Sequence, residues 1–273
     1  MRYTEKLAAR IRTTGSRLCV GLDPRFDLIA GDPADFLKRV IEETLPHAAA
    51  FKPNIAYFEQ RGSAGIRLLE QLFTMIPSDV PVILDAKRGD IGETQKAYCH
   101  AYFDQWEVDA VTLSPFLGFD TIEPFLDSPG RAVYLLAVTS NPGASEFALQ
   151  RLAADGRYVF EHVQDMIGRA AGRAAEVGLV IGLTNASTEV MQRVMDAPLL
   201  VPGLGAQGGE LAALEATRRS APSVVNVSRG ILFADPELPF REKARRWAAR
   251  IARSHQAPRR PPDPDASGSA APA

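Results

Sequence analysis

The sequence contains little cysteine, little net charge and no long apolar run. Only two of its 273 residues are cysteine, Cys19 and Cys99, which is too few for a disulfide framework and leaves no CxxC metal motif. The formal net charge of −2 at pH 7 argues against a general nucleic-acid or anionic-membrane surface. No stretch reaches the ~18 apolar residues of a membrane span, and the charged first residues lack the apolar core of a signal peptide. We therefore expect a cytoplasmic protein that binds neither nucleic acid nor membrane.

Several catalytic signatures are also missing. The sequence has no Walker A motif, no zinc motif and no Ser-His-Asp elbow. The turn after the first apolar run reads LDPRFD and lacks the G-x-G-x-x-G of a dinucleotide site. The histidines occur in segments with a helical pattern or in the tail and have no metal-ligand spacing. They are His47, His100, His162 and His255. The sequence thus predicts no metal site and no cofactor.

Eight short apolar runs alternate with longer amphipathic segments. The runs have the length and the two-sided apolar character of parallel strands covered by helices. They are residues 17–23, 49–54, 81–87, 108–114, 131–140, 178–185, 198–205 and 223–230. The segments with a helical pattern include 33–48, 63–76, 157–177, 209–220 and the C-terminal REKARRWAARIAR. This count and size predict an α/β fold, a single-domain (β/α)8 TIM barrel. A doubly wound Rossmann-type sheet is the alternative, although it usually has fewer strands and a Gly-rich first turn.

The composition changes near the C-terminus. From about Ser254 the sequence is rich in Pro, Ala and Ser and has almost nothing to bury. We therefore predict a catalytic barrel over residues 1–252 and a disordered tail over residues 253–273.

Polar residues stand at the ends of the apolar runs. In α/β barrels, catalytic residues gather at the C-terminal ends of the strands. The candidates at these ends are Asp23, Lys52, Asp85, Lys87, Ser114, Thr139, Ser140, Asn185, Gln207 and Arg229. Each of them alone also fits a loop that begins where a strand ends, so it is their common position at one rim that favours a site.

The densest group of charges is the segment LDAKRGDI at residues 84–91. Asp85 and Lys87 are two residues apart, so on an extended strand both would face the barrel mouth. Opposite charges are costly to bury unless they are paired or used in chemistry, and a structural salt bridge is therefore the alternative to a catalytic role. The chain has 6 Lys against 25 Arg, yet Lys52 and Lys87 both end predicted strands. Because an amine can exchange a proton and a guanidinium cannot, this placement indicates amine chemistry.

The last two strand ends have the pattern of an anion site. The segment PGLGAQGG at residues 202–209 supplies glycines that let backbone N–H groups approach a ligand, and a predicted helix follows. Arg229 comes directly after the last apolar run and could bind a pair of oxygens. Loops after strands seven and eight form the recurring phosphate site of barrels. Glycine-rich loops are often only tight turns, so the prediction depends on Arg229 as well.

Together these segments resemble the orotidine 5′-phosphate decarboxylase family, whose members catalyse the last step of UMP synthesis. The resemblance is strongest to the bacterial type 2 branch, which has the segments AFKPNIAYFE and LDAKRGDIG. It covers the chain from about Leu18 to Leu232, and the blocks FKPN, TSNPGA, PGLGAQGG and NVSRG occur in the family's order.

The resemblance implies decarboxylation of orotidine 5′-monophosphate to UMP and CO2 without a cofactor, in a homodimer. Lys52, Asp85 and Lys87 of one subunit would alternate with Asp90 contributed by the other subunit. Asp85 would face the substrate carboxylate, and Lys87 would deliver a proton to C6 as carbon dioxide leaves. Lys52 would hold Asp85 and contact the ribose.

The resemblance also implies a set of residues that bind the nucleotide. Asp23 would bind a ribose hydroxyl and Ser140 the pyrimidine edge. Arg229 would bind the phosphate, and Gln207 would bridge base and phosphate from a mobile loop. Thr94, with Asp90, would reach the ribose and phosphate region of the neighbouring subunit. The full binding set is Asp23, Ile91, Thr94, Ser140, Pro202, Gln207, Ser228 and Arg229.

Two other functions fit the same barrel. A magnesium-dependent decarboxylase or aldolase acting on sugar phosphates resembles this chain in its Asp-x-Lys-x-x-Asp segment, but it has an acidic residue where this chain has Lys52. A catalytically silent phosphate-binding barrel would bind UMP weakly and turn nothing over. Assays of activity on orotidine 5′-monophosphate with and without EDTA test these alternatives, because chelator-sensitive activity or no activity on this substrate would favour one of them.

Overall fold

The strands form a closed ring. The structure is a computed structural model that describes residues 1–203, 209–217 and 219–256. The strands are β1 Leu18–Leu22, β2 Ala50–Pro53, β3 Ile83–Arg88, β4 Ala110–Leu113, β5 Ala132–Val138, β6 Glu176–Ile181, β7 Leu199–Pro202 and β8 Ser223–Val227. All neighbours pair in parallel, in the order β2-β1-β8-β7-β6-β5-β4-β3. Two isolated parallel bridges, Phe51 with Val82 and Asn54 with Asp85, join the ends of this sheet.

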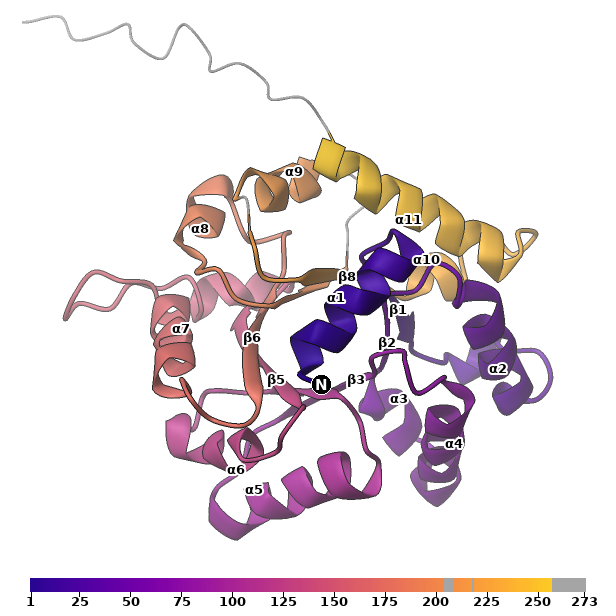
Figure 1. Ribbon diagram of the computed structural model, residues 1–273, viewed down its shortest axis with the longest axis horizontal. Coiled ribbons are helices and arrows are strands. Elements are labelled where there is room, and N and C mark those ends of the chain that lie inside the picture. The colour runs from indigo at the N-terminus through magenta and orange to yellow at the C-terminus, as the bar shows by residue number, and fades with distance from the viewer. Residues whose placement is uncertain (204–208, 218, 257–273) are drawn as a thin grey trace, which may run out of the picture.

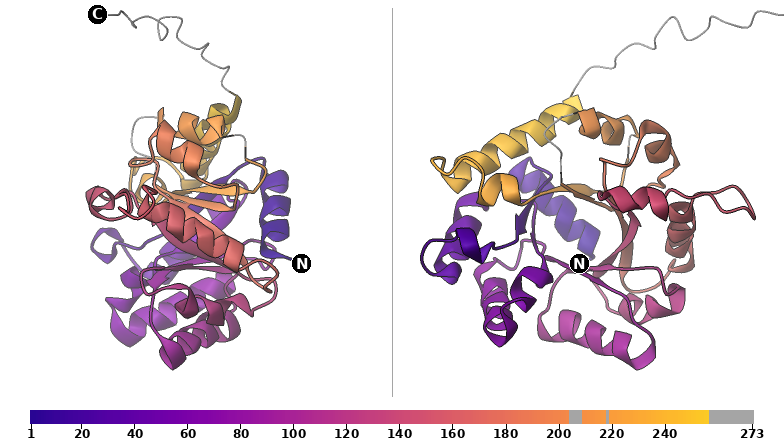
Figure 2. Two further views of the ribbon diagram at one scale, coloured as in Figure 1. Left: turned by 90° about the vertical axis from the view of Figure 1, so that its left-hand side faces the viewer. Right: turned by 180° about the vertical axis from the view of Figure 1, so that it is seen from behind.

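The α-helices lie around the ring, except the first, which lies across one of its ends (Figures 1 and 2). They are α1 Tyr3–Thr14, α2 Pro33–Thr44, α3 Ile55–Glu59, α4 Gly62–Met75, α5 Gly92–Cys99, α6 Glu123–Leu126, α7 Val159–Arg169, α8 Thr188–Arg193, α9 Gly209–Ala216, α10 Arg229–Leu232 and α11 Phe240–Gln256. The architecture is therefore the predicted (β/α)8 TIM barrel, and every predicted apolar run contains or overlaps a strand.

One predicted helix is too long. The helical pattern over 157–177 includes an Ala-rich stretch, but α7 ends at Arg169. Gly172 has a φ of 81°, a left-handed conformation that turns the chain, and Glu176 already pairs with Ala132 of β5. Helix propensity is a weak prior, and here the pairing of β6 with the sheet overrides it.

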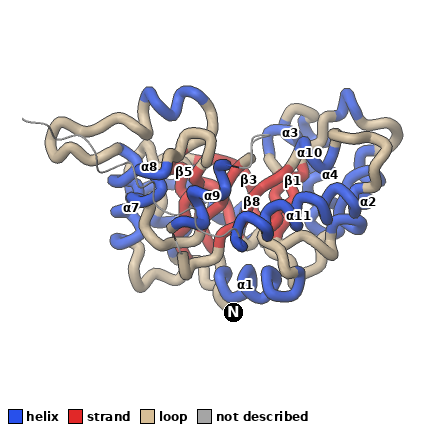
Figure 3. Tube along the Cα trace, turned by 90° about the horizontal axis from the view of Figure 1, so that it is seen from above, coloured by secondary structure: helices blue, strands red, loops and turns tan. Residues whose placement is uncertain are grey.

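The first helix closes one end of the barrel. Figure 1 shows α1 across the opening of the ring, and Figure 3 shows it beyond the ends of the strands. Its Tyr3 and Leu7 are buried with side chains of the barrel interior, and the Tyr3 hydroxyl lies 3.1 Å from that of Tyr134. Lys6 pairs with Asp109 at 2.6 Å. The N-terminal ends of the strands are thus closed, which leaves the C-terminal rim for ligands.

The barrel continues past its predicted boundary. Helix α11 packs against α2 and β1 and runs beyond residue 252 to Gln256. Residues 257–273 lie outside the described residues, so the disordered tail stays a prediction.

Candidate active site

The ends of β2 and β3 bring three of the predicted charged residues together. The Lys52 ammonium lies 2.7 Å from Oδ2 of Asp85, and the Lys87 ammonium lies 2.5 Å from Oδ1 of the same carboxylate. The Lys52 side chain is 4% exposed and that of Asp85 12%, whereas that of Lys87 is 49% exposed. One carboxylate therefore lies between a buried ammonium and an accessible one, at the rim opposite α1.

Burial and neighbouring charges shift the pKa values of Lys52 and Asp85 in opposite directions. Burial alone would lower the pKa of Lys52, but the carboxylates of Asp85 and Asp23 outweigh it, so the pKa lies well above its ordinary value. Burial alone would raise the pKa of Asp85, but Lys52 and Lys87 outweigh it, and the pKa lies well below its ordinary value. Asp85 and Lys52 are therefore both charged at neutral pH.

The local backbone differs from the extended strand that the spacing suggests. Lys87 has a φ of 49°, and the register between β3 and β4 shifts between Leu84 and Arg88. The Lys87 ammonium contacts the Asp85 carboxylate, and a bulge in β3 accompanies this contact in place of a regular extended strand. Such bulges recur next to active sites.

Thr112 on β4 belongs to the same cluster and was missed from the sequence. Its hydroxyl donates to Oδ1 of Asp85 at 3.1 Å and accepts from the backbone N–H groups of Ala86 and Lys87 at 3.0 and 2.9 Å. The one signal in the sequence is a hydroxyl in the apolar run VDAVTLS, which is also common in ordinary strands.

Arg88 follows Lys87 on β3, and its side chain is held by neighbouring helical segments. Nε of Arg88 donates to the Tyr102 hydroxyl at 2.7 Å, a terminal nitrogen pairs with Glu59, and the guanidinium lies over the ring of Tyr98. Arg88 is thus held by α3, by α5 and by the helical turn that follows α5. This leaves Lys87 as the cation of β3 that contacts Asp85.

Two buried oxygen acceptors lie near the ends of β1 and β8. Oδ1 of Asp23 and Oδ1 of Asn226 are buried, and neither has a hydrogen-bond partner within the described ranges. Gly21 lets these strands approach closely, because a Cβ there would lie 2.6 Å from Cβ of Ser228. Buried acceptors are rarely left unpaired in proteins, so these oxygens can accept donors from a ligand or from water.

Ser140 follows β5 and is exposed on the same rim. Its loop is held by Asn185, whose side-chain amide donates to the backbone carbonyls of Thr139 and Asn141 at 2.8 and 2.7 Å. A Cβ on Gly182 would lie 2.6 Å from the backbone nitrogen of Ser140, so only glycine fits where β6 ends against this loop.

The predicted anion site is described in part. Pro202 ends β7, and Arg229 begins α10 directly after Ser228. Arg229 is exposed, and among the described residues no ion pair is formed by its guanidinium. Gln207 lies outside the described residues, and its predicted role is untested.

Asp90, Ile91 and Thr94 lie on the segment that leads from β3 into α5. Oδ1 of Asp90 accepts from the backbone N–H of Ile91 at 2.8 Å, and Ile91 and Thr94 are exposed. Within one chain, the structure does not bring Asp90 into contact with Lys52, Asp85 or Lys87.

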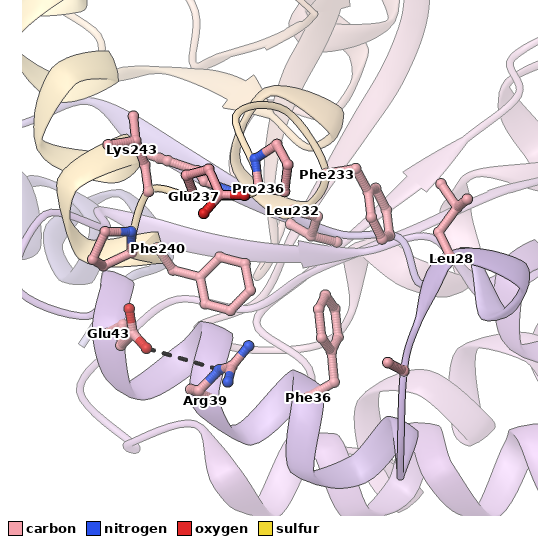
Figure 4. A pocket seen from close by; sticks show the side chains of 13 residues that line it. Leu28, Phe36, Arg39, Glu43, Leu232, Phe233, Pro236, Glu237, Phe240 and Lys243 are labelled. Carbon is pink, nitrogen blue, oxygen red and sulfur yellow. Dashed lines mark ion pairs between the residues drawn. The ribbon is translucent and has the colours of Figure 1, made fainter.

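A cavity of about 660 Å³ lies away from this rim cluster, between α2, the turn after α10 and the start of α11 (Figure 4). Its lining includes Phe36, Arg39, Glu43, Phe233, Phe240 and Lys243. No described residue of the predicted site lines this cavity.

Two features are absent from the described part of the chain. No three His, Cys, Asp or Glu side chains gather there in a way that could hold a metal ion. Over the same residues, no helix is both long enough and apolar enough to cross a membrane.

Comparison with known proteins gives the family. The family model described as "Orotidine 5'-phosphate decarboxylase / HUMPS family" matches residues 16–242. A protein of Verminephrobacter eiseniae named orotidine 5'-phosphate decarboxylase is 42% identical, covering 95% of this chain and 100% of its own. A protein of the same name from Herpetosiphon aurantiacus is 38% identical, covering 90% of this chain and 95% of its own. The solved Leishmania donovani OMP decarboxylase superposes with a TM-score of 0.82 at 34% identity, covering 94% of this chain and 100% of that one. The chain therefore belongs to the orotidine 5′-phosphate decarboxylase / HUMPS family.

Proposed function

We propose that this chain decarboxylates orotidine 5′-monophosphate to UMP, the last step of pyrimidine nucleotide synthesis. The observation that carries the proposal is the Asp85 carboxylate placed between the ammonium groups of Lys52 and Lys87 at the C-terminal rim. The names of the relatives support the choice of substrate.

The reaction follows from the charges. The bond between C6 and the substrate carboxylate breaks, CO2 leaves, and the electron pair stays on C6 in the plane of the ring. The ammonium of Lys87 stabilises this charge and then transfers a proton to C6, and the resulting amine regains a proton from solvent. Its exposure of 49% lets Lys87 meet both substrate and water.

Lys52 and Asp85 have supporting parts in this mechanism. The ion pair with Lys52 keeps Asp85 ionised, and Asp85 in turn holds the Lys87 ammonium in place. Asp85 also presents negative charge to the substrate carboxylate, so the repulsion between them is relieved as CO2 leaves. We place the ribose beside Lys52 and Asp23.

Substrate recognition is distributed around the rim. We assign the phosphate to Arg229, assisted by Ser228, Pro202 and Gln207, and the pyrimidine edge to Ser140. An exposed guanidinium suits two phosphate oxygens at once. Binding energy from this remote phosphate can organise the charged cluster for the chemical step.

We propose a homodimer in which Asp90, Ile91 and Thr94 reach the site of the neighbouring subunit. The support is exposed apolar surface on the loops after β3, β4 and β5, where Ile91, Phe116, Leu117 and Phe147 are exposed. The rings of Phe116 and Phe147 lie 5.6 Å apart. Exposed apolar groups of this kind mark interaction surfaces, and a second copy seated on them would bring its Asp90 to the rim.

Lys52 distinguishes this proposal from the magnesium-dependent sugar-phosphate alternative, which has an acidic residue at that position. A buried ammonium there is paired with Asp85 and would repel a divalent cation. We also propose a cytoplasmic location, where free thiols such as those of Cys19 and Cys99 stay reduced.

The test is the ultraviolet absorbance of orotidine 5′-monophosphate mixed with purified protein, with and without EDTA. We expect conversion to UMP at the same rate in both. Loss of activity with chelator would favour the magnesium-dependent alternative. UMP binding without any conversion would favour the silent phosphate-binding barrel.

A further inference from the structure

The strand that carries Asp85 and Lys87 does not pair regularly with its neighbour. Leu84 pairs with Val111 and Arg88 pairs with Leu113, so residues 85 to 87 lie opposite Thr112 alone. A bulge of this kind leaves backbone N–H groups without their ladder partners. Because such groups are costly to bury unpaired, another acceptor must replace the missing carbonyl.

The Thr112 hydroxyl is that acceptor. It accepts from the N–H groups of Ala86 and Lys87, and it donates to Oδ1 of Asp85. A hydroxyl has one donor and two acceptor positions, and all three are used here. Thr112 is 1% exposed, so water cannot easily substitute.

The same hydroxyl therefore fixes both the backbone and the carboxylate. Lys87 has a φ of 49°, which non-glycine residues seldom adopt, and its N–H is held by Thr112 in that conformation. Oδ1 of Asp85, the oxygen that Thr112 contacts, is also the oxygen that the Lys87 ammonium contacts.

We propose that Thr112 is a positioning residue for decarboxylation, which sets the backbone of Lys87 and the orientation of Asp85 so that the ammonium points at the reacting carbon. This inference rests on the proposed function. When Lys87 gives up its proton, Oδ1 of Asp85 loses a charged donor, and the Thr112 hydroxyl remains. Thr112 thus keeps the carboxylate in place across the proton transfer.

The test compares three variants with the parent enzyme. Thr112→Val keeps the shape and removes the hydroxyl, and Thr112→Ser keeps the hydroxyl. Thr44→Val is the control, because Thr44 is also fully buried but donates to the carbonyl of Val40 within α2 and not to Asp85. Misplacing a reacting group by about 1 Å can cost ~100-fold in rate. We therefore expect Thr112→Val to lower kcat roughly 100-fold.

KM, the affinity for UMP and the kcat values of the other variants distinguish a positioning role from a general loss of structure. KM and the affinity for UMP should change less than about threefold in Thr112→Val, because the phosphate contacts are untouched. Thr112→Ser should recover most of kcat, and Thr44→Val should lose stability but keep kcat.

Several results would overturn the inference: a kcat near the parent value in Thr112→Val, an increase in KM alone, or equally poor activity in Thr112→Ser. If Thr112→Val does not fold, Thr112→Cys takes its place, since a thiol is a weak donor and acceptor. Its kcat should fall at least tenfold, and an unchanged kcat would likewise refute the role. A parent enzyme with no activity on orotidine 5′-monophosphate would instead refute the proposed function.

Discussion

Lys52 and Lys87 contact the same carboxylate, yet their removal should affect stability very differently. The Lys52 side chain is 4% exposed, and replacing it by methionine leaves the Asp85 carboxylate without its buried partner. Removing one member of a buried ion pair costs about 3–5 kcal/mol. Asp85 keeps Lys87 and the Thr112 hydroxyl, so we expect the lower end, about 3 kcal/mol. For a chain of this size that lowers Tm by roughly 6–12 °C.

Lys87→Met should cost much less. Its side chain is 49% exposed, and exposed ion pairs contribute about 0–1 kcal/mol. Both variants should lose most of their turnover. Urea unfolding followed by circular dichroism gives the stabilities, and the absorbance assay gives the rates. Equal losses of stability in the two variants would refute the distinction between a buried and an accessible ammonium.

A double variant and the pH dependence sharpen this prediction. Lys52→Met combined with Asp85→Asn removes the unpaired charge, so it should regain part of the lost stability and stay inactive. The pKa of Asp85 is lowered in the folded protein. Stability from its pairing is therefore complete above the unfolded pKa of ~3.9 and is lost as the pH falls through the folded pKa. The stability difference between parent and Lys52→Met should be constant from about pH 6 to 8 and shrink below about pH 4.

Three further predictions concern catalysis, binding and assembly. Lys87→Ala should lower kcat by roughly 10²–10⁴-fold or more with an unchanged fold, and near-normal turnover would remove its role as proton donor. Arg229→Ala should raise KM roughly 10- to 100-fold, since a hydrogen bond to a charged group contributes about 1.5–3 kcal/mol; an unchanged KM would contradict the phosphate assignment. Phe116→Glu should shift the protein from dimer to monomer in analytical ultracentrifugation and lower turnover. Met195→Glu, an exposed apolar control that precedes β7 at the opposite rim, should do neither, and a Phe116→Glu variant that stays dimeric would refute the proposed interface.

The barrel was predictable because its strands are buried on both faces. Continuous apolar runs such as 131–140 predict strands that are covered by helices, and the number of runs predicts the number of strands. The rim was also predictable, because the C-terminal ends of parallel strands meet at one edge of the barrel. Lys52 and Asp85, which lie far apart in the sequence, could therefore be expected to meet.

Features that depend on contacts between distant segments were not predictable. Nothing in the segment MRYTEKLAAR indicates that Tyr3 packs against Tyr134 inside the barrel, so that α1 closes one end of the barrel. The Ala-rich end of the predicted helix 157–177 could not reveal that Glu176 already pairs with β5. The role of Thr112 depends on a bulge in a different strand, so its contacts exist only once β3 and β4 are paired.

The two lysines look equivalent in the sequence, and their surroundings separate their functions. Both were predicted to do amine chemistry because most basic residues of the chain are arginine and these two lysines end predicted strands. Burial alone would make Lys52 a better proton donor by lowering its pKa, but the carboxylates of Asp85 and Asp23 reverse that effect and hold its proton. Lys52 therefore acts as a fixed positive charge, compact enough to be buried where a guanidinium would need several partners. Proton transfer falls to Lys87, because its ammonium contacts the same carboxylate but remains half open to a substrate at the rim.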